Sequence, residues 1–138
     1  MSKDMEYLWK ANQKALGLTD EQVEMMKKNP KAVKMIQHSP DLYNKKIVAE
    51  IVKTKNCACH KVGDKIVFRV AGGMIKEESC ENPCLFAIGP LATLGYIIFD
   101  RVASGCDTSE LMIDSIKCMD VGLENGGVGE VLMKIRVE

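Results

Sequence analysis

The sequence has no excess of charge of either sign, because its 138 residues carry 19 basic and 19 acidic side chains. A protein dedicated to nucleic acid usually presents a basic face with few compensating acids, so this balance argues against a nucleic-acid partner. Aromatic residues are also scarce, with one Trp, three Tyr and three Phe against nine Met. We therefore expect an adaptable core that contains methionine rather than an aromatic one.

Several signatures of function are missing as well. Residues 1–10 are polar and lack the apolar segment of a secretory signal, so we expect a cytoplasmic protein. The stretch Gly126-Gly127-Val128-Gly129 lacks the Lys-Ser/Thr pair of a P-loop and leads into a strand, which predicts a turn rather than a phosphate site. No Gly-x-Ser-x-Gly elbow occurs. A serine hydrolase is therefore not indicated.

The first 45 residues are predicted to form short helices. Apolar residues recur at helical spacing over residues 4–16, and Gly17 ends this helix. Thr19 and Gln22 form a capping box, which starts a second helix. Two further start signals place proline at the first turn of a helix, namely Asn29-Pro30 and Ser39-Pro40. These amphipathic helices are candidates for the surface that binds a protein partner or a second copy of the chain.

The remainder, residues 46–138, shows strand patterns on both sides of one long apolar run. The run spans residues 83–99 without a charge, and Pro90 is expected to break or kink the helix there. Gly105 is expected to close the helix. The predicted strands cover residues 46–53, 65–70, 111–119 and 130–137. The sequence thus predicts an α+β protein, in which a helical segment (1–45) packs on a mainly antiparallel sheet that cradles the 83–104 helix (46–138).

The apolar run has the length of a marginal membrane span. Gly89-Pro90 and Gly95 interrupt it, and no basic residue flanks its start. A buried central helix explains the run better, so we expect no membrane partner.

Residues 46–138 also resemble a family of short, cysteine-containing α+β proteins found mainly in anaerobic bacteria and archaea. The resemblance rests on residues 62–68, on Cys84 opening an apolar helix, on residues 117–122 and on the closing strand 131–138. It implies the order strand, strand, helix, strand, strand, and it implies that cysteine is usual at Cys84 and Cys118. The family has no assigned activity, and its members usually carry aromatic residues where this chain has Leu85 and Phe86.

The thiols offer the clearest chemistry in the chain. Four of them fall within 28 positions beside one imidazole, and a fifth follows later. Thiolates and imidazole are ligands of zinc, and three or four thiolates hold iron–sulfur clusters. The candidate metal ligands are Cys57, Cys59, His60, Cys80, Cys84 and Cys118, with Cys84 and Cys118 as co-ligands or a dithiol pair. Cys106 is expected to be incidental.

Cys84 carries a second hypothesis. With Asn82 as N-cap and Pro83 at the first helical position, it is expected in the first turn of the helix, where the helix dipole stabilises a thiolate. A small enzyme with Cys84 as nucleophile and His60 as base is one alternative.

The leading hypothesis is a small cytoplasmic thiol-rich protein that binds zinc or an iron–sulfur centre and acts as an accessory or redox subunit. The remaining alternative is a non-catalytic interaction or assembly module whose cysteines are structural. Convergence of the sulfur atoms would favour the first, and dispersed buried thiols would favour the second.

Overall fold

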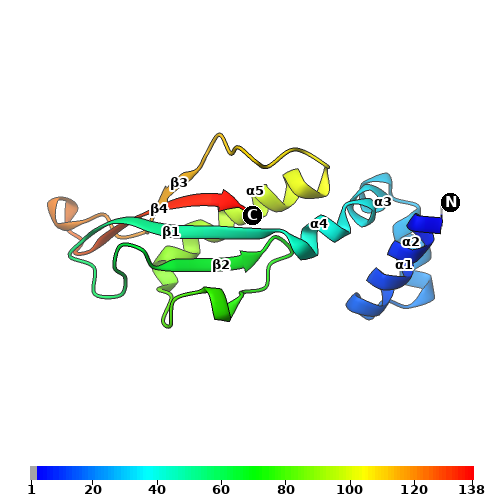
Figure 1. Cartoon of the computed structure of the whole chain (residues 1–138), viewed down its shortest axis with the longest axis horizontal. Helices are drawn as coiled ribbons and strands as arrows, with labels where there is room; N and C mark the ends of the chain where they lie inside the picture. Colours follow the sequence, from blue (N-terminus) through cyan, green and yellow to red (C-terminus); the bar gives the residue numbers. More distant parts are fainter. Residues whose placement is uncertain (1–2) are drawn as a thin grey trace.

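In the computed structural model, which describes residues 3–138, four short helices precede a four-stranded sheet that packs on one long helix (Figure 1). The predicted α+β class is therefore confirmed. The first two residues of the predicted 1–45 segment lie outside the described part. The elements are α1 (Lys3–Leu16), α2 (Asp20–Lys27), α3 (Pro30–Gln37), α4 (Ser39–Asn44), β1 (Lys46–Lys55), β2 (Lys65–Arg69), the 3₁₀ turn η1 (Lys76–Glu78), α5 (Leu85–Ala103), β3 (Ser115–Lys117), η2 (Leu123–Asn125) and β4 (Glu130–Val137).

The N-terminal helices begin where the capping signals predict. Thr19 is the N-cap of α2, since its hydroxyl accepts the Gln22 amide at 3.2 Å and the Gln22 side chain accepts the Thr19 amide at 2.8 Å. Asn29 caps α3 through the amide of Lys31. These helices enclose a small core of their own, made of Trp9, Val23 and Ile36. α4 then leads from this group into β1 (Figure 1).

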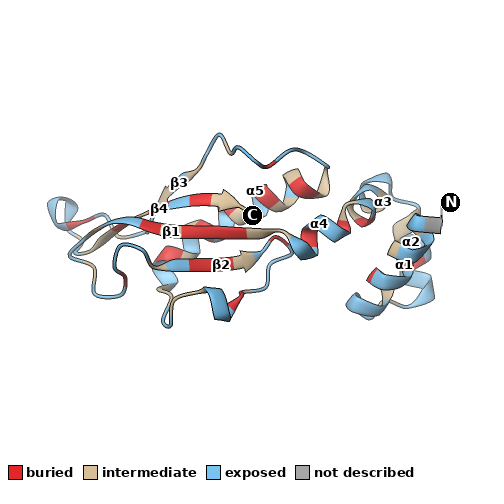
Figure 2. Cartoon of the chain, viewed as in Figure 1, coloured by how far each residue is buried: buried red, intermediate tan, exposed pale blue. Residues whose placement is uncertain are grey.

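The strands form one antiparallel sheet in the order β2-β1-β4-β3. β4 alternates as predicted, with Val131, Met133 and Ile135 each 2% exposed or less. The centres of β1 and β2 are buried in consecutive residues (Figure 2). Val48 and Val67 pack with Ile75 in a separate small cluster, whereas Ile47, Ala49 and Ile66 face inward with the three β4 side chains. These inward side chains and one face of α5 make up the main hydrophobic core.

β3 contains three residues, so the strand predicted over residues 111–119 is wrong in length. The apolar side chains of Met112 and Ile113 are 93% and 62% exposed, so no buried face holds that segment in the sheet. Asp114 still contacts β4, because its carbonyl accepts the Ile135 amide at 2.7 Å and its carboxylate pairs with Lys134 at 2.7 Å. β3 and β4 are antiparallel neighbours, as expected.

The start of α5 differs from the prediction. The helix begins at Leu85, and Cys84 is its N-cap in an extended conformation (φ −73°, ψ 132°) without a side-chain cap bond. Cys84 therefore lies before the first turn and not within it. The carbonyl of Cys84 accepts the amides of Ala87 and Ile88, at 3.1 and 3.0 Å, which fixes this start. At the other end Gly105 has a φ of 77° and closes the helix as predicted.

α5 also continues through Pro90 as one helix, so of the predicted break or kink the break is wrong. Proline lacks an amide hydrogen, and this leaves the carbonyl of Phe86 without its partner in the helix. The amide of Met119 donates to that carbonyl at 3.0 Å and replaces the missing bond. A residue far along the chain thus allows the helix to keep its proline.

One face of α5 packs on the sheet through Ala87, Leu91, Leu94, Ile98 and Val102. The opposite face is exposed and apolar at Leu85 and Tyr96, which are 71% and 79% exposed. With 19 residues and a mean hydropathy of 1.4, α5 is long and apolar enough to cross a membrane by length and composition alone. Soluble proteins with a core helix meet the same criterion, so it is weak support for a membrane span.

Candidate metal site

The loop between β1 and β2 holds His60 and Asp64 in a tight turn. The amide of Asp64 donates to the carbonyl of Lys61 at 3.1 Å, and Gly63 adopts a φ of 96°, which glycine reaches without steric cost. Ile51 of β1 fastens the turn, because it accepts the Gly63 amide at 2.9 Å and donates to the Asp64 carbonyl at 2.8 Å. The positions of both side chains therefore follow from the hairpin itself.

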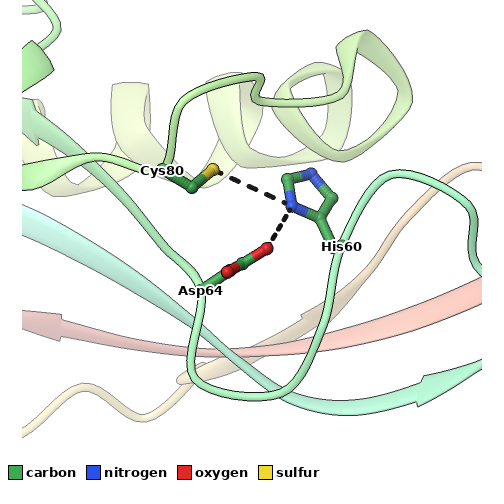
Figure 3. A group of neighbouring side chains, drawn as sticks. All are labelled: His60, Asp64 and Cys80. Carbon is green, nitrogen blue, oxygen red and sulfur yellow. Dashed lines mark hydrogen bonds and ion pairs between the residues drawn. The ribbon is translucent and has the colours of Figure 1, made fainter.

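Three different donor groups converge beside this turn (Figure 3). Nδ1 of His60 lies 3.3 Å from Oδ2 of Asp64 and 3.9 Å from Sγ of Cys80. The three ligand atoms all lie within 4.8 Å of one another. Cys80 comes from the segment before α5, where its amide donates to the carbonyl of Lys65 at 2.7 Å. An imidazole, a carboxylate and a thiol so arranged are able to hold a metal ion.

The proton on His60 can be placed from its neighbours. The side chain is 1% exposed, and its Nε2 lies 3.0 Å from the backbone nitrogen of Cys84. A backbone amide only donates, so Nε2 is the acceptor and carries no proton. In the neutral ring the proton is then on Nδ1, which donates to the carboxylate of Asp64.

The charges around the site follow from these contacts. The Lys61 amide, which donates to Oδ2 at 3.1 Å, holds the pKa of Asp64 below its ordinary value, and the His60 ring adds to this effect. Burial raises the pKa of the Cys80 thiol, and the negative charge of Asp64 raises it further. Without a metal ion, the site therefore holds an ionised carboxylate beside a protonated thiol.

Cys57, Cys59 and Cys84 lie around His60 but are not members of the three-donor group in the described chain. Sγ of Cys57 accepts the backbone amide of His60 at 3.4 Å, which helps to shape the loop. The thiols of Cys59 and Cys84 are hydrogen-bonded to each other, and this contact raises the pKa of Cys59. Nε2 of His60 contacts the backbone of Cys84, so its lone pair is directed at that amide.

Cys118 follows β3, and its thiol accepts the amide of Val131 at 3.4 Å. The backbone amide of its neighbour Met119 donates to the carbonyl of Phe86 in the first turn of α5. Cys118 and Cys84 therefore lie at the same end of the molecule. Both are partly buried against the core. Cys106, expected to be incidental, is exposed.

Two of the six predicted ligands, His60 and Cys80, are thus brought together. Asp64 was missed, because a search for thiols and imidazoles passes over an aspartate that also fits a turn. Its position directly after Gly63 was the available signal, since a turn that reverses the chain returns its last residue toward its first. Cys80 is held near them because the segment after β2 returns along that strand, where the Cys80 amide donates to the carbonyl of Lys65 and the Ser79 hydroxyl bonds to Val67. No spacing within the sequence encodes that return.

The donor set fits one divalent ion of the zinc class, for which nitrogen, oxygen and sulfur ligands are all usual. Binding at Nδ1 would require the ring proton that now faces Asp64 to move to Nε2. A metal-bound imidazole usually donates its second N–H to a carbonyl or a carboxylate, whereas Nε2 of His60 here accepts from Cys84. Binding of an ion is therefore linked to the contact that holds the start of α5.

Comparison with known proteins identifies no relative: no protein-family model, no curated protein and no solved structure matches the chain. The resemblance of residues 46–138 to the cysteine-containing α+β family stays a prediction.

Proposed function

We propose that this protein binds one divalent transition-metal ion, zinc above all, through His60, Asp64 and Cys80, and that it serves as a small metal-binding accessory protein. The observation that carries the proposal is the convergence of three donor atoms within 4.8 Å around an imidazole that is 1% exposed. Imidazole, carboxylate and thiolate are all ligands of zinc, and these side chains supply three of the four positions of a tetrahedral site.

The burial of the donors favours an ion that is held rather than one that turns over substrate. Catalytic zinc keeps an open position for water, whereas the side chains of His60 and Asp64 are 1% and 16% exposed. An ion in this place would join the β1–β2 loop to the segment that leads into α5. Its role would be to hold the thiol-rich end of the molecule in shape.

A mononuclear ion is better supported than an iron–sulfur cluster. Clusters are held mainly by thiolates, and only Cys80 supplies a sulfur to the three-donor group. The hypothesis of a cysteine nucleophile has less support again, because His60 directs its acceptor nitrogen to the amide of Cys84. We retain neither as the leading function.

The test is metal analysis of protein purified without oxygen, followed by titration of the metal-free protein with Co²⁺. Sulfur ligation gives Co²⁺ an intense near-ultraviolet absorption, so the spectrum reports Cys80 directly. We expect one ion per chain in the native protein, with binding abolished by Cys80→Ser and strongly weakened by Asp64→Asn.

Cys106→Ser is the matched control, because it removes an exposed thiol outside the site. It is expected to leave both the stoichiometry and the spectrum unchanged. A folded native protein that takes up neither Zn²⁺ nor Co²⁺ would contradict the proposal, and so would a Cys80→Ser variant with the native spectrum.

A protein partner for the N-terminal helices is a second proposal. Tyr7 on α1 and Met25 on α2 are 71% and 70% exposed, although both are large apolar side chains. Light scattering over a range of concentrations tests self-association, with Tyr7→Lys and Met25→Lys as variants. A native mass above that of the monomer, lost in both variants, is expected if the partner is a second copy. An equal mass in all three proteins would contradict self-association through this surface.

A further inference from the structure

An apolar cavity of about 570 Å³ lies between α5, the end of β2 and α3, and it shares no lining residue with the metal site. Its volume falls within the range of small-molecule sites, which is about 300–1,000 Å³. The walls come from the sheet at Ile47 and Phe68 and from α5 at Leu91 and Phe99. The space is therefore shaped for a ligand with an apolar body.

Arg69 is the one charged residue that lines this cavity in the described chain. Its Nη1 donates to the carbonyl of Tyr43 at 2.9 Å, which holds the side chain in place. No carboxylate of the described residues pairs with it, whereas Arg136 pairs with the carboxylates of Glu50 and Glu138. A guanidinium has five N–H donors in a fixed fork that suits a carboxylate, so most of its donors here are available to an anion.

The opening of the cavity is marked by a pair of aromatic rings. Tyr96 and Phe99 stack with their centroids 6.1 Å apart and their planes at 9°. Tyr96 is 79% exposed while it lines the cavity, so it stands where the cavity meets solvent. Ala92 and Gly95 on the same helix leave room beside the rings.

We propose that this cavity binds a small amphiphilic carboxylate, with its apolar chain or ring among Phe68, Leu91 and Phe99 and its carboxylate on Arg69. The single positive charge in an otherwise apolar lining is what selects this class over neutral or cationic ligands. This site is independent of the proposed metal function, since none of its residues is a metal ligand.

The experiment is isothermal titration of the full chain with decanoate, at concentrations below those at which decanoate forms micelles. Arg69→Gln is expected to weaken decanoate binding about tenfold, because it removes a charge-assisted pair. Arg101→Gln is the matched control, since Arg101 is bonded to the carbonyl of Asp107 and lies outside the cavity. It is expected to bind decanoate as the native chain does.

Two further comparisons separate the head group from the chain. Decyltrimethylammonium is expected to bind at least tenfold more weakly than decanoate, because its charge opposes Arg69. Ala92→Leu, which fills the cavity from α5 and suits a helix, is expected to lose binding while the circular dichroism spectrum stays native.

Three results would overturn the proposal. The first is a native chain that does not bind decanoate, and the second is equal affinity in Arg69→Gln and Arg101→Gln. The third is retention on anionic phospholipid vesicles without binding of free decanoate, which would identify a membrane surface instead.

Discussion

The backbone amide of Cys84 donates to Nε2 of His60 across 3.0 Å, although the two residues are 24 positions apart. This bond joins the β1–β2 loop to the residue that precedes α5. It also decides which ring nitrogen carries the proton. Because Nε2 accepts from Cys84, the proton of the neutral ring is on Nδ1, the nitrogen that faces Asp64 and Cys80. One hydrogen bond therefore links the start of the long helix to the candidate metal site.

His60→Ala is expected to destabilise the metal-free protein. It leaves the partly buried amide of Cys84 without its acceptor, which costs about 1–3 kcal/mol in the free energy of unfolding. Urea unfolding followed by circular dichroism measures the change. Val62→Ala in the same loop is the control, since Val62 is 61% exposed and its loss is expected to cost less than about 0.5 kcal/mol. Equal stability of the two variants would show that the His60–Cys84 bond contributes little.

Metal affinity is expected to increase with pH. Burial and the charge of Asp64 raise the pKa of the Cys80 thiol, so the thiol is protonated near neutral pH and a metal must displace that proton. Each such proton makes the apparent affinity rise about tenfold per pH unit until the thiol titrates. Co²⁺ titrations at pH 6, 7 and 8 measure this slope. An affinity that is constant over this range would exclude Cys80 as a ligand.

The sequence predicted most elements, since their signals are local. The capping box of Thr19 and Gln22 and the alternation of β4 depend only on neighbouring residues, and both are found. The predicted 83–104 helix was expected to break or kink at Pro90, because the bond that replaces the missing hydrogen bond comes from the distant Met119. The same limit applies to the short β3, where only the fold reveals that Met112 faces solvent.

The candidate site was predicted in part for a similar reason. The thiols and His60 were chosen by chemical type, which succeeded for His60 and Cys80. Their meeting depends on the bond between the Cys80 amide and Lys65 of β2, and the place of Asp64 depends on the turn that Gly63 permits. Spacing along the chain could not distinguish Cys80 from the four other candidate thiols.

Protonation of the Asp120 carboxylate is expected to make the protein less stable in acid. Its carboxylate accepts the amides of Gly122, Val128 and Gly129 at 2.9, 2.9 and 3.0 Å, and these bonds hold its pKa below the ordinary value of 3.8. Because the folded-state pKa is lowered, the stabilisation is complete above the ordinary value and is lost as the pH falls through the folded value.

Asp120→Asn is therefore expected to lower stability at pH 7. Between pH 5 and pH 2, the variant is expected to lose less stability than the native chain does. The urea midpoint at each pH measures both effects. Asp100→Asn, at an exposed position on α5, is the control and is expected to keep the native dependence on pH. A native slope in Asp120→Asn would assign the acid sensitivity to other carboxylates.

Two glycines in α5 are expected to respond differently to replacement by alanine. Alanine is favoured over glycine in a helix interior by about 0.5–1 kcal/mol, provided that its methyl group fits. At Gly95 the added carbon would lie 3.7 Å from Cδ1 of Ile47, which is an ordinary contact, so Gly95→Ala should gain most of this stability. At Gly89 it would lie 3.1 Å from Sδ of Met119, and that side chain would have to move. Gly89→Ala should therefore gain less, and urea unfolding of both variants measures the order. An equal or larger gain in Gly89→Ala would mean that the side chain of Met119 moves aside at no cost.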